Sequence, residues 1–370
     1  MASDPVTQTM SQETESKKTA SNKTEPGNFF EDFSVGQRIA HATPRTLTEG
    51  EVALYVALFG TRFALNSSDP FARQMGLPRA PVDSLLAFHM VFGKTVADIS
   101  LNAIANLGYA NGRFGVPLYP GDTVTTDSTV IGLRQNKDGR TGVVYVHSTG
   151  VNQNGEMVLD YVRWVMVRKR DTEAPAPETV VPSLPDSVRA DALILPYQVD
   201  LAQYDCQRAG SPYLWDEYEP GERIDHVDGI TIEESEHMIA ARMFQNTARV
   251  HFNQHVEKDG RFGRRIIYGG YIISLARALS FNGLANAQSI AAINGGRHVS
   301  PCFAGDTVYA WTQVQERQAI PGRSDLGALR LRTVATKDRS CADFPYKDPA
   351  GAYDPAVLLD FDYSVLMPRR

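Results

Sequence analysis

The sequence predicts an α+β fold built from two similar halves. The stretches GRFGVPLYPGDT at 112–123 and GRHVSPCFAGDT at 296–307 match at Gly, Arg, Pro, Gly, Asp and Thr. FSVGQRIAHA at 33–42 and YEPGERIDHV at 218–227 match at Gly, Arg, Ile and His, at nearly the same offset. An internal repeat of this length indicates a duplicated structural unit, and its pattern of helix followed by strands is typical of an α+β architecture.

Each half begins with two predicted helices. The Thr-x-x-Glu pairs Thr46/Glu49 and Thr231/Glu234 predict capping boxes ahead of the apolar-periodic runs VALYVALFG and HMIAARMF. A second and more apolar helix is predicted from SLLAFHMVFGKTV in the first half and from YIISLARALSFNGL in the second.

Strands are predicted after the second helix of each half. The turn that ends in Gly-Asp-Thr leads into β-rich runs: TVTTDSTVIGLR and VVYVHSTGV in the first half, TVYAWTQVQ and ALRLRTVAT in the second. The final runs at 159–170 and 359–370 match at a larger offset, which predicts an insertion around 341–353. In both copies Pro and Gly shape the turn that enters a strand, so we expect the repeated turn to build the fold.

Two stretches outside this pattern predict the domain boundaries. Residues 1–28 are dominated by Ser, Thr, Lys and Glu, which predicts a disordered tail. Residues 171–190 are rich in proline and acids, which predicts an extended linker. The two halves are therefore expected at 29–170 and 191–370.

Composition restricts the partners and the compartment. A formal net charge of −6 offers no global positive field, so nucleic acid is not an expected partner. We find neither a membrane-spanning run nor a hydrophobic signal segment, and therefore expect a cytoplasmic protein that does not bind membranes. Three widely spaced cysteines predict reduced thiols rather than disulfides or a zinc site.

The halves differ most just after the first helix, and this difference indicates where the chemistry lies. Asn246 and His251 stand where the first half has Thr61 and Asn66. A neutral His251 can accept a proton from water, and the amide of Asn246 can orient that water. Two other interpretations remain open: a hydrogen-bonded structural histidine, or a zinc pair with His255, which lacks an obvious cysteine or carboxylate ligand nearby.

The start of the second half's central helix is a candidate anion site. Gly269 and Gly270 would leave free backbone N–H groups at the positive end of the helix dipole, where an oxyanion is stabilised. Asp83 occupies this region in the first half, and its carboxylate would repel an oxyanion. The first half is thus expected to be structural or to lend residues to the other half, although tight packing would also explain the glycine pair.

Arg261, Arg264 and Arg265 form a local basic cluster just before this helix. Guanidinium groups bind phosphates well, so the cluster is a candidate phosphate site. A solvated loop that binds nothing is the alternative.

These motifs resemble the MaoC-like hydratases. The capped helix, the NTARVHFNQH loop, the RRIIYGGYIISLARAL helix start and the Pro-x-x-x-Gly-Asp-Thr turn follow that family's order. The resemblance implies a hot-dog fold, a long helix wrapped by an antiparallel sheet, present twice as a double hot dog. Longer stretches, among them VDSLLAFHMVFGKTV and ISLNAIANLGYANGRFG, are similar to the mesaconyl-CoA hydratases over nearly everything after Pro26.

The resemblance implies reversible hydration of mesaconyl-CoA to β-methylmalyl-CoA, with CoA as part of the substrate and no metal or redox cofactor. His251 matches the family's catalytic histidine, whereas Asn246 stands where the family has aspartate. Tyr268 and Gly269 match the family's His-Gly helix start, which implies that the N–H of Gly269 or Gly270 is the oxyanion donor.

The substrate that the resemblance implies carries a free carboxylate on its β-carbon, so its pocket needs a cation. Arg249 is the candidate, with Arg62 and Arg297 as alternatives, and Asp83 from the first half is a candidate to complete the catalytic set. A hot-dog thioesterase, a hydratase of other short enoyl-CoA substrates and a non-catalytic acyl-CoA-binding module remain alternatives. We also expect a homo-oligomer, since hot-dog units commonly pair.

Overall fold

The computed structural model describes residues 23–195 and 199–370, and in this part eleven strands form one antiparallel sheet. The strand order is β1-β3-β4-β5-β2-β8-β11-β10-β9-β6, and β7 pairs with β9. The strands of the two halves therefore lie side by side in one sheet. Their bounds are β1 Arg38–Thr46, β2 Ala103–Phe114, β3 Thr123–Gln135, β4 Thr141–Val151, β5 Met157–Arg168, β6 Arg223–Asp225, β7 Ile230–Thr231, β8 Ser289–His298, β9 Thr307–Ala319, β10 Leu326–Lys337 and β11 Val357–Pro368.

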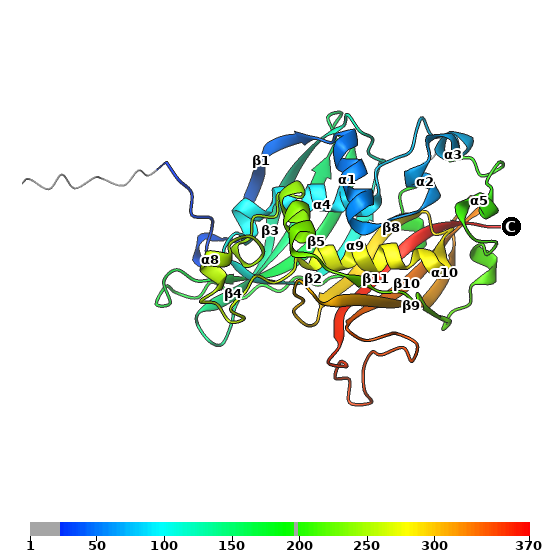
Figure 1. Ribbon diagram of the computed structural model, residues 1–370. Helices are drawn as coiled ribbons and strands as arrows, with labels where there is room; N and C mark the ends of the chain where they lie inside the picture. The colour runs from blue at the N-terminus through cyan, green and yellow to red at the C-terminus, as the bar shows by residue number, and fades with distance from the viewer. Residues whose placement is uncertain (1–22, 196–198) are drawn as a thin grey trace, which may run out of the picture.

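Two central helices pack on this sheet, one in each half: α4 (Ser84–Lys94) and α9 (Gly269–Leu279). Helix α4 contacts β1, β3 and β5, and α9 contacts β9, β10 and β11, over which it lies in Figure 1. The shorter helices are α1 Glu49–Phe59, α2 Ala64–Ser67, α3 Asp69–Gln74, α5 Cys206–Ala209, α6 Glu234–Met243, α7 Arg249–Phe252, α8 Gln254–Glu257 and α10 Phe281–Leu284, with single turns η1 Phe30–Asp32, η2 Val96–Ser100, η3 Ala190–Ala192 and η4 Trp215–Glu217. Within the described residues, no helix combines the length and the hydropathy needed to span a bilayer.

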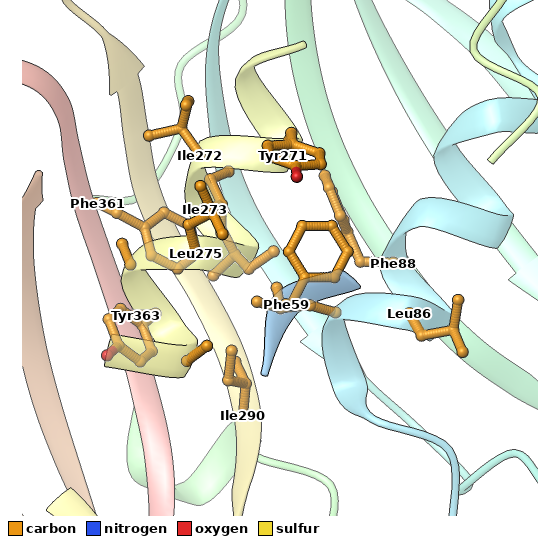
Figure 2. Close-up of a cluster of buried hydrophobic side chains, with 14 of the residues drawn as sticks. Phe59, Leu86, Phe88, Tyr271, Ile272, Ile273, Leu275, Ile290, Phe361 and Tyr363 are labelled. Atoms are coloured by element: carbon orange, nitrogen blue, oxygen red, sulfur yellow. The ribbon is translucent and has the colours of Figure 1, made fainter. Parts of the chain in front are cut away.

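One hydrophobic core joins the two halves, and Figure 2 shows its centre. Ile273 and Leu275 of α9 pack beside Phe361 of β11, while Phe59 of α1 and Phe88 of α4 approach from the first half. None of these side chains is more than 3% exposed. Burying a side chain of this kind stabilises a fold by roughly 1.5–3 kcal/mol, so the packing between the central helices is a major part of what holds the halves together.

The sheet is continuous because β2 of the first half pairs with β8 of the second. Tyr109 lies opposite Gly296, and Gly112 lies opposite Ile293. A Cβ added at Gly296 would come within 2.9 Å of the Tyr109 ring, so only glycine lets the strands approach this closely here. The sequence patterns did not predict these two strands, which are rich in Ala, Gly and Asn.

The repeated Gly-Asp-Thr turn has the same structural role in both halves. Gly121, at φ 105°, donates its N–H to the carbonyl of Leu47 at 2.8 Å, and the Asp122 carboxylate accepts the N–H of Tyr119 at 2.8 Å. The second half repeats both bonds around Gly305, at φ 94°. The turn leads into a strand and contributes to the fold, as the sequence predicts, and the structure adds that it ties the strand to the segment before the first helix.

The predicted capping boxes Thr46/Glu49 and Thr231/Glu234 are wrong. Thr46 and Thr231 are the last residues of β1 and β7, and their hydroxyls bond the threonines of the two Gly-Asp-Thr turns. Helix α1 is capped instead by Thr48, which forms a complete capping box with the residue three positions on. Helix α6 begins without a side-chain cap.

The chain outside the two halves is partly anchored. Most of the predicted tail, residues 1–22, lies outside the described residues. Residues 26–28 are ordered rather than part of a free tail, because Asn102 Nδ2 donates to all three of their carbonyls at 3.0–3.1 Å. In the linker, Val180 exchanges backbone hydrogen bonds with Leu133 of β3, so this segment lies along the sheet. The predicted boundaries between the halves remain predictions.

Candidate active site

A cavity of about 330 Å³ lies between the two halves. Residues of β2 and β5 form the wall from the first half, and the start of α9, helix α7 and the segment after β8 form the wall from the second. Of the residues predicted for the site, those that line it are Asn246, His251, Arg261, Tyr268 and Gly269. Those that lie outside its lining are Asp83, Arg249, Arg264, Arg265 and Gly270.

His251 is held so that one ring nitrogen stays available. Its Nδ1–H donates to the carbonyl of Ile266 at 3.0 Å, and within the described residues Nε2 makes no hydrogen bond. Burial lowers the pKa of His251 to about 4, so the ring is neutral at pH 7 and Nε2 can accept a proton. His255 of the alternative zinc pair is exposed on α8, and across residues 23–195 and 199–370 no three His, Cys, Asp or Glu side chains are grouped to hold a metal ion.

The first half keeps the anchoring bond of this histidine but not its chemistry. Asn66, the counterpart of His251, donates its Nδ2–H to the carbonyl of Pro81 at 3.0 Å. Pro81 is in turn the counterpart of Ile266. An amide in this position cannot act as a base, so the difference between the halves is the free imidazole nitrogen.

The N-terminus of α9 opens onto the cavity beside His251. The N–H groups of Gly269 and Gly270 belong to the first turn, which has no acceptor within its own helix. The preceding N–H, of Tyr268, donates to Nε2 of the buried His237 at 3.0 Å. Tyr268 is itself buried, and its ring centroid lies 5.7 Å from that of His251. The geometry therefore offers backbone donors to a developing negative charge.

His298, the last residue of β8, also lines the cavity, and the sequence analysis did not single it out. Its ring lies against the helix start, since a Cβ added at Gly269 would be 2.3 Å from His298 Cε1. Its Nε2 lies 3.3 Å from the Tyr109 hydroxyl, and burial lowers its pKa to about 4. One signal was available, because the repeated stretch has Phe114 where the second copy has this histidine.

Asn246 and Asp83 occupy very different places. Asn246 is buried at the cavity wall, where its Oδ1 accepts only a long hydrogen bond of 3.4 Å from the N–H of Ala248. Asp83 is the N-cap of α4 and accepts the N–H of Leu85 at 2.8 Å. The structure therefore places Asn246, and not Asp83, in the lining of the cavity that His251 also lines.

The predicted phosphate cluster is divided among different roles. Arg261 lines the cavity and is exposed, as expected for a group at its mouth. Arg264 stacks on the ring of Phe303 at 3.9 Å. Arg265 is engaged by Glu234, to which it donates a hydrogen bond of 2.5 Å.

Arg249, the candidate for the substrate carboxylate, points elsewhere. Its guanidinium donates to Asn102 Oδ1 and to the carbonyl of Pro26, so it fixes the N-terminal segment. Of the alternatives, Arg62 stacks on a phenylalanine ring outside the cavity and Arg297 is exposed. A buried arginine that does line the cavity is Arg163 of β5, which the sequence analysis passed over.

Comparison with known proteins places this geometry in a family. The family model for mesaconyl-CoA hydratase matches residues 7–344. The chain belongs to the mesaconyl-CoA hydratase family. It is 73% identical over 350 residues to the β-methylmalyl-CoA dehydratase of Chloroflexus aurantiacus, covering 95% of this chain and 99% of that protein. It is 59% identical over 349 residues to the mesaconyl-CoA hydratase of Cereibacter sphaeroides, covering 94% of this chain and 100% of that protein.

Solved structures confirm the predicted double hot-dog fold for this mesaconyl-CoA hydratase family member. A MaoC domain protein from Chloroflexus aurantiacus superimposes with a TM-score of 0.92 at 73% identity, covering 95% of this chain and 100% of that one. A conserved hypothetical protein from Mycobacterium tuberculosis, described as a double hot dog, superimposes with a TM-score of 0.75 at 27% identity, covering 92% and 99%. Each half is thus a hot-dog unit, with α4 or α9 as its central helix.

In this family member, a second cavity of about 90 Å³ occupies the equivalent place in the first unit. Three positions of interest are changed there: Asn66 for His251, Ser84 for Gly269 and Phe114 for His298. This smaller cavity is also lined by three residues that follow the predicted linker, namely Ile194, Val199 and Leu201. The candidate chemistry is therefore present at one of the two equivalent places.

Proposed function

We propose that this chain catalyses the reversible addition of water to mesaconyl-CoA, forming β-methylmalyl-CoA. Its relatives at 73% and 59% identity are named β-methylmalyl-CoA dehydratase and mesaconyl-CoA hydratase, after the two directions of that reaction. One observation supports assigning the reaction to this cavity. His251 has a free Nε2 and lies beside the N-terminus of α9. A neutral base and backbone oxyanion donors are the two groups that hydration of a conjugated thioester needs.

His251 is the proposed general base. Its Nε2 takes a proton from water as the water oxygen attacks the β-carbon of the thioester. The resulting imidazolium is stabilised by the bond that Nδ1 already makes to the carbonyl of Ile266. Asn246, whose amide is almost free of other partners, is proposed to orient the attacking water.

The start of α9 is the proposed oxyanion site. As water adds, negative charge moves onto the thioester oxygen, and the N–H groups of Gly269 and Gly270 donate to it. The α-carbon then takes a proton, which restores the thioester. The step as written requires no metal ion or redox cofactor.

The CoA portion of the substrate is proposed to leave the cavity past Arg261. This exposed guanidinium, with Arg264 on the same loop, offers charge-assisted hydrogen bonds to phosphate oxygens. The pantetheine chain would then pass along the apolar wall formed by Phe262 and Pro301.

A direct assay tests the proposal. The pure protein is incubated with mesaconyl-CoA and, separately, with β-methylmalyl-CoA, while the absorbance of the conjugated thioester and the free thiol are both followed. We expect loss of conjugation from the first substrate, its appearance from the second, and no thiol. Thiol release would identify a thioesterase, and no change in either signal would leave only binding; both results would contradict the proposal.

His251→Ala is expected to lower kcat by roughly 10²–10⁴-fold, the usual contribution of a general base. The matched control is Asn66→Ala, which makes the equivalent truncation at the equivalent place in the first unit and is expected to keep near-normal turnover. Similar losses in the two variants would assign the effect to folding and would overturn the role given to His251.

We also expect the enzyme to work in the cytoplasm as a homo-oligomer, since hot-dog units commonly pair. Light scattering coupled to size-exclusion chromatography measures the mass of the assembly, and a mass of one chain, 40.8 kDa, would contradict the oligomer.

A further inference from the structure

Arg163 is a buried cation without a buried anion to match it. It is 0% exposed, although it lies on the cavity wall. Its guanidinium donates to Thr95 Oγ1 at 2.8 Å, to Ser100 Oγ at 3.3 Å and to Asn106 Oδ1 at 3.4 Å, all of them neutral groups. Within residues 23–195 and 199–370 it forms no ion pair, and its Nε–H has no acceptor.

Among the described residues the other buried arginine, Arg277, likewise has no ion pair, but it lies outside the cavity lining and donates to Ser280 Oγ and to the carbonyl of Ala287. The half-buried Arg330 on β10 does have a carboxylate, since it donates to both oxygens of Asp362 at 2.9 and 2.8 Å. Taking a guanidinium out of water without a counter-charge is costly, whereas a paired one is tolerated. Of these two buried and unpaired arginines, Arg163 is the one that lies at the cavity, where an entering anion would offset this cost.

Arg163 lies on the first-half wall of the cavity, and two tyrosines connect it to the candidate catalytic groups on the other wall. Tyr268 and Tyr109 lie close enough to interact electrostatically with its guanidinium. The ring of Tyr268 contacts His251, and the hydroxyl of Tyr109 contacts His298. The other arginines in the lining, Arg168 and Arg261, are exposed, so they suit the mouth of the cavity rather than its interior.

We propose that Arg163 binds the free carboxylate of the substrate and determines its specificity. This inference rests on the proposed function, in which that carboxylate is attached to the β-carbon that water attacks. Pairing the carboxylate with Arg163 would hold the β-carbon in the cavity that His251 also lines. A guanidinium carries parallel N–H donors, which match the bidentate geometry of a carboxylate.

A matched pair of substrates tests the inference. In 2-methylcrotonyl-CoA a methyl group replaces the carboxylate of mesaconyl-CoA, and the reacting double bond is otherwise the same. For Arg163→Met, we expect kcat/KM to fall by roughly 10²-fold or more with mesaconyl-CoA and by less than about 10-fold with 2-methylcrotonyl-CoA. Arg249→Met is measured beside it, since it makes the same change outside the cavity.

The inference would be overturned if Arg163→Met lost the same factor of kcat/KM on both substrates, or if only Arg249→Met showed a selective loss. Either result would leave the proposed hydratase activity in place. If the wild type hydrates neither substrate, the proposed function itself fails, and the two failures are therefore distinct. The folding of each variant is checked by its thermal unfolding.

If the Met variant does not fold, a conservative variant and a binding measurement replace it. Arg163→Lys keeps the charge but loses the planar pair of donors. Competitive inhibition by succinyl-CoA is compared with inhibition by butyryl-CoA, which differ only in a carboxylate against a methyl group. We expect the wild type to prefer succinyl-CoA and Arg163→Lys to lose roughly 10-fold or more of that preference; an unchanged preference would overturn the inference.

Discussion

At the scale of single residues, Gly269 and His298 depend on one another. The imidazole occupies the space where any other residue at 269 would place its Cβ, at 2.3 Å from Cε1. The glycine thus allows a histidine from β8 to lie directly against the helix start. This contact makes the requirement for glycine specific to the second unit, because the first unit has Ser84 and Phe114 at these positions.

Gly269→Ala is expected to lower the free energy of unfolding by roughly 1–3 kcal/mol, the usual effect of overpacking, because it displaces the imidazole. In a His298→Ala background the same substitution should cost almost nothing, since the conflicting ring is gone and alanine favours a helix over glycine. Urea denaturation of the two single variants and the double variant measures the coupling. Additive effects would contradict the contact.

Comparison of the halves predicted part of the candidate site and missed other residues that line its cavity, for identifiable reasons. His251 was predicted because a base faces an amide in the other half. His298 was missed because it lies inside a stretch treated as purely structural. Arg163 was missed because it stands in the strand LDYVRWVMVRKR, where a single arginine resembles an exposed position. Its burial depends on which face of the sheet packs against η2, and this is settled only by the fold.

At the scale of elements, the turn Gly-Asp-Thr is the clearest part that the two units share. It orders the chain between a strand and the first helix, and it does so with equivalent hydrogen bonds in each unit. The carboxylate of Asp122 or Asp306 accepts a backbone N–H that otherwise has no partner within the turn. Neither carboxylate lines the main cavity.

Asp122→Ala and Asp306→Ala are each expected to lower the free energy of unfolding by roughly 1–3 kcal/mol, because each leaves a backbone donor unpaired. Asp122→Asn and Asp306→Asn keep an acceptor and should cost less. All four variants should retain kcat with mesaconyl-CoA. Denaturant titration measures the stability, and an alanine variant as stable as the wild type would contradict the structural role of the turn.

Elements with a strong periodic pattern were predicted, and those formed by tertiary pairing were not. The central helices and the strands β3, β4, β5, β9, β10 and β11 lie where apolar periodicity and β-branched runs place them. Strands β2 and β8 are built largely from Ala, Gly and Asn, which have low strand propensity. They are strands because they pair with each other at the junction, and close backbone approach there requires small residues.

At the scale of the whole molecule, neutral histidines are buried throughout the core. His89, His226 and His237 are at most 2% exposed, and burial lowers their pKa values to about 3, 4 and 3 respectively. In the unfolded chain a histidine titrates near its ordinary pKa of about 6.5. Between these values the unfolded state binds more protons, so acid favours unfolding.

The free energy of unfolding is therefore expected to fall as the pH decreases from about 6.5 toward 4. Together with His251 and His298, whose pKa values burial also lowers to about 4, these histidines take up about five protons on unfolding near pH 5, so the slope should approach ~6 kcal/mol per pH unit. Urea denaturation at several pH values measures this slope. His226→Asn removes one of these protons and should lower the slope by about 1.4 kcal/mol per pH unit, whatever its effect on the absolute stability. An unchanged slope in that variant would contradict the lowered pKa of His226.

The two units have different cavities, and this difference allows the enzyme to become selective for one substrate. In a symmetric assembly of identical chains, every substitution occurs in all the equivalent cavities. A residue that improves binding on one wall is therefore also present at the symmetry-equivalent position. Fusion into one polypeptide removes that constraint. Arg163 stands in one unit, and Tyr363 stands at the matching place in the other. If the catalytic groups act as proposed, the first unit is free to vary as a recognition wall for the site of the second, and a saturated chain should hold one thioester molecule rather than two.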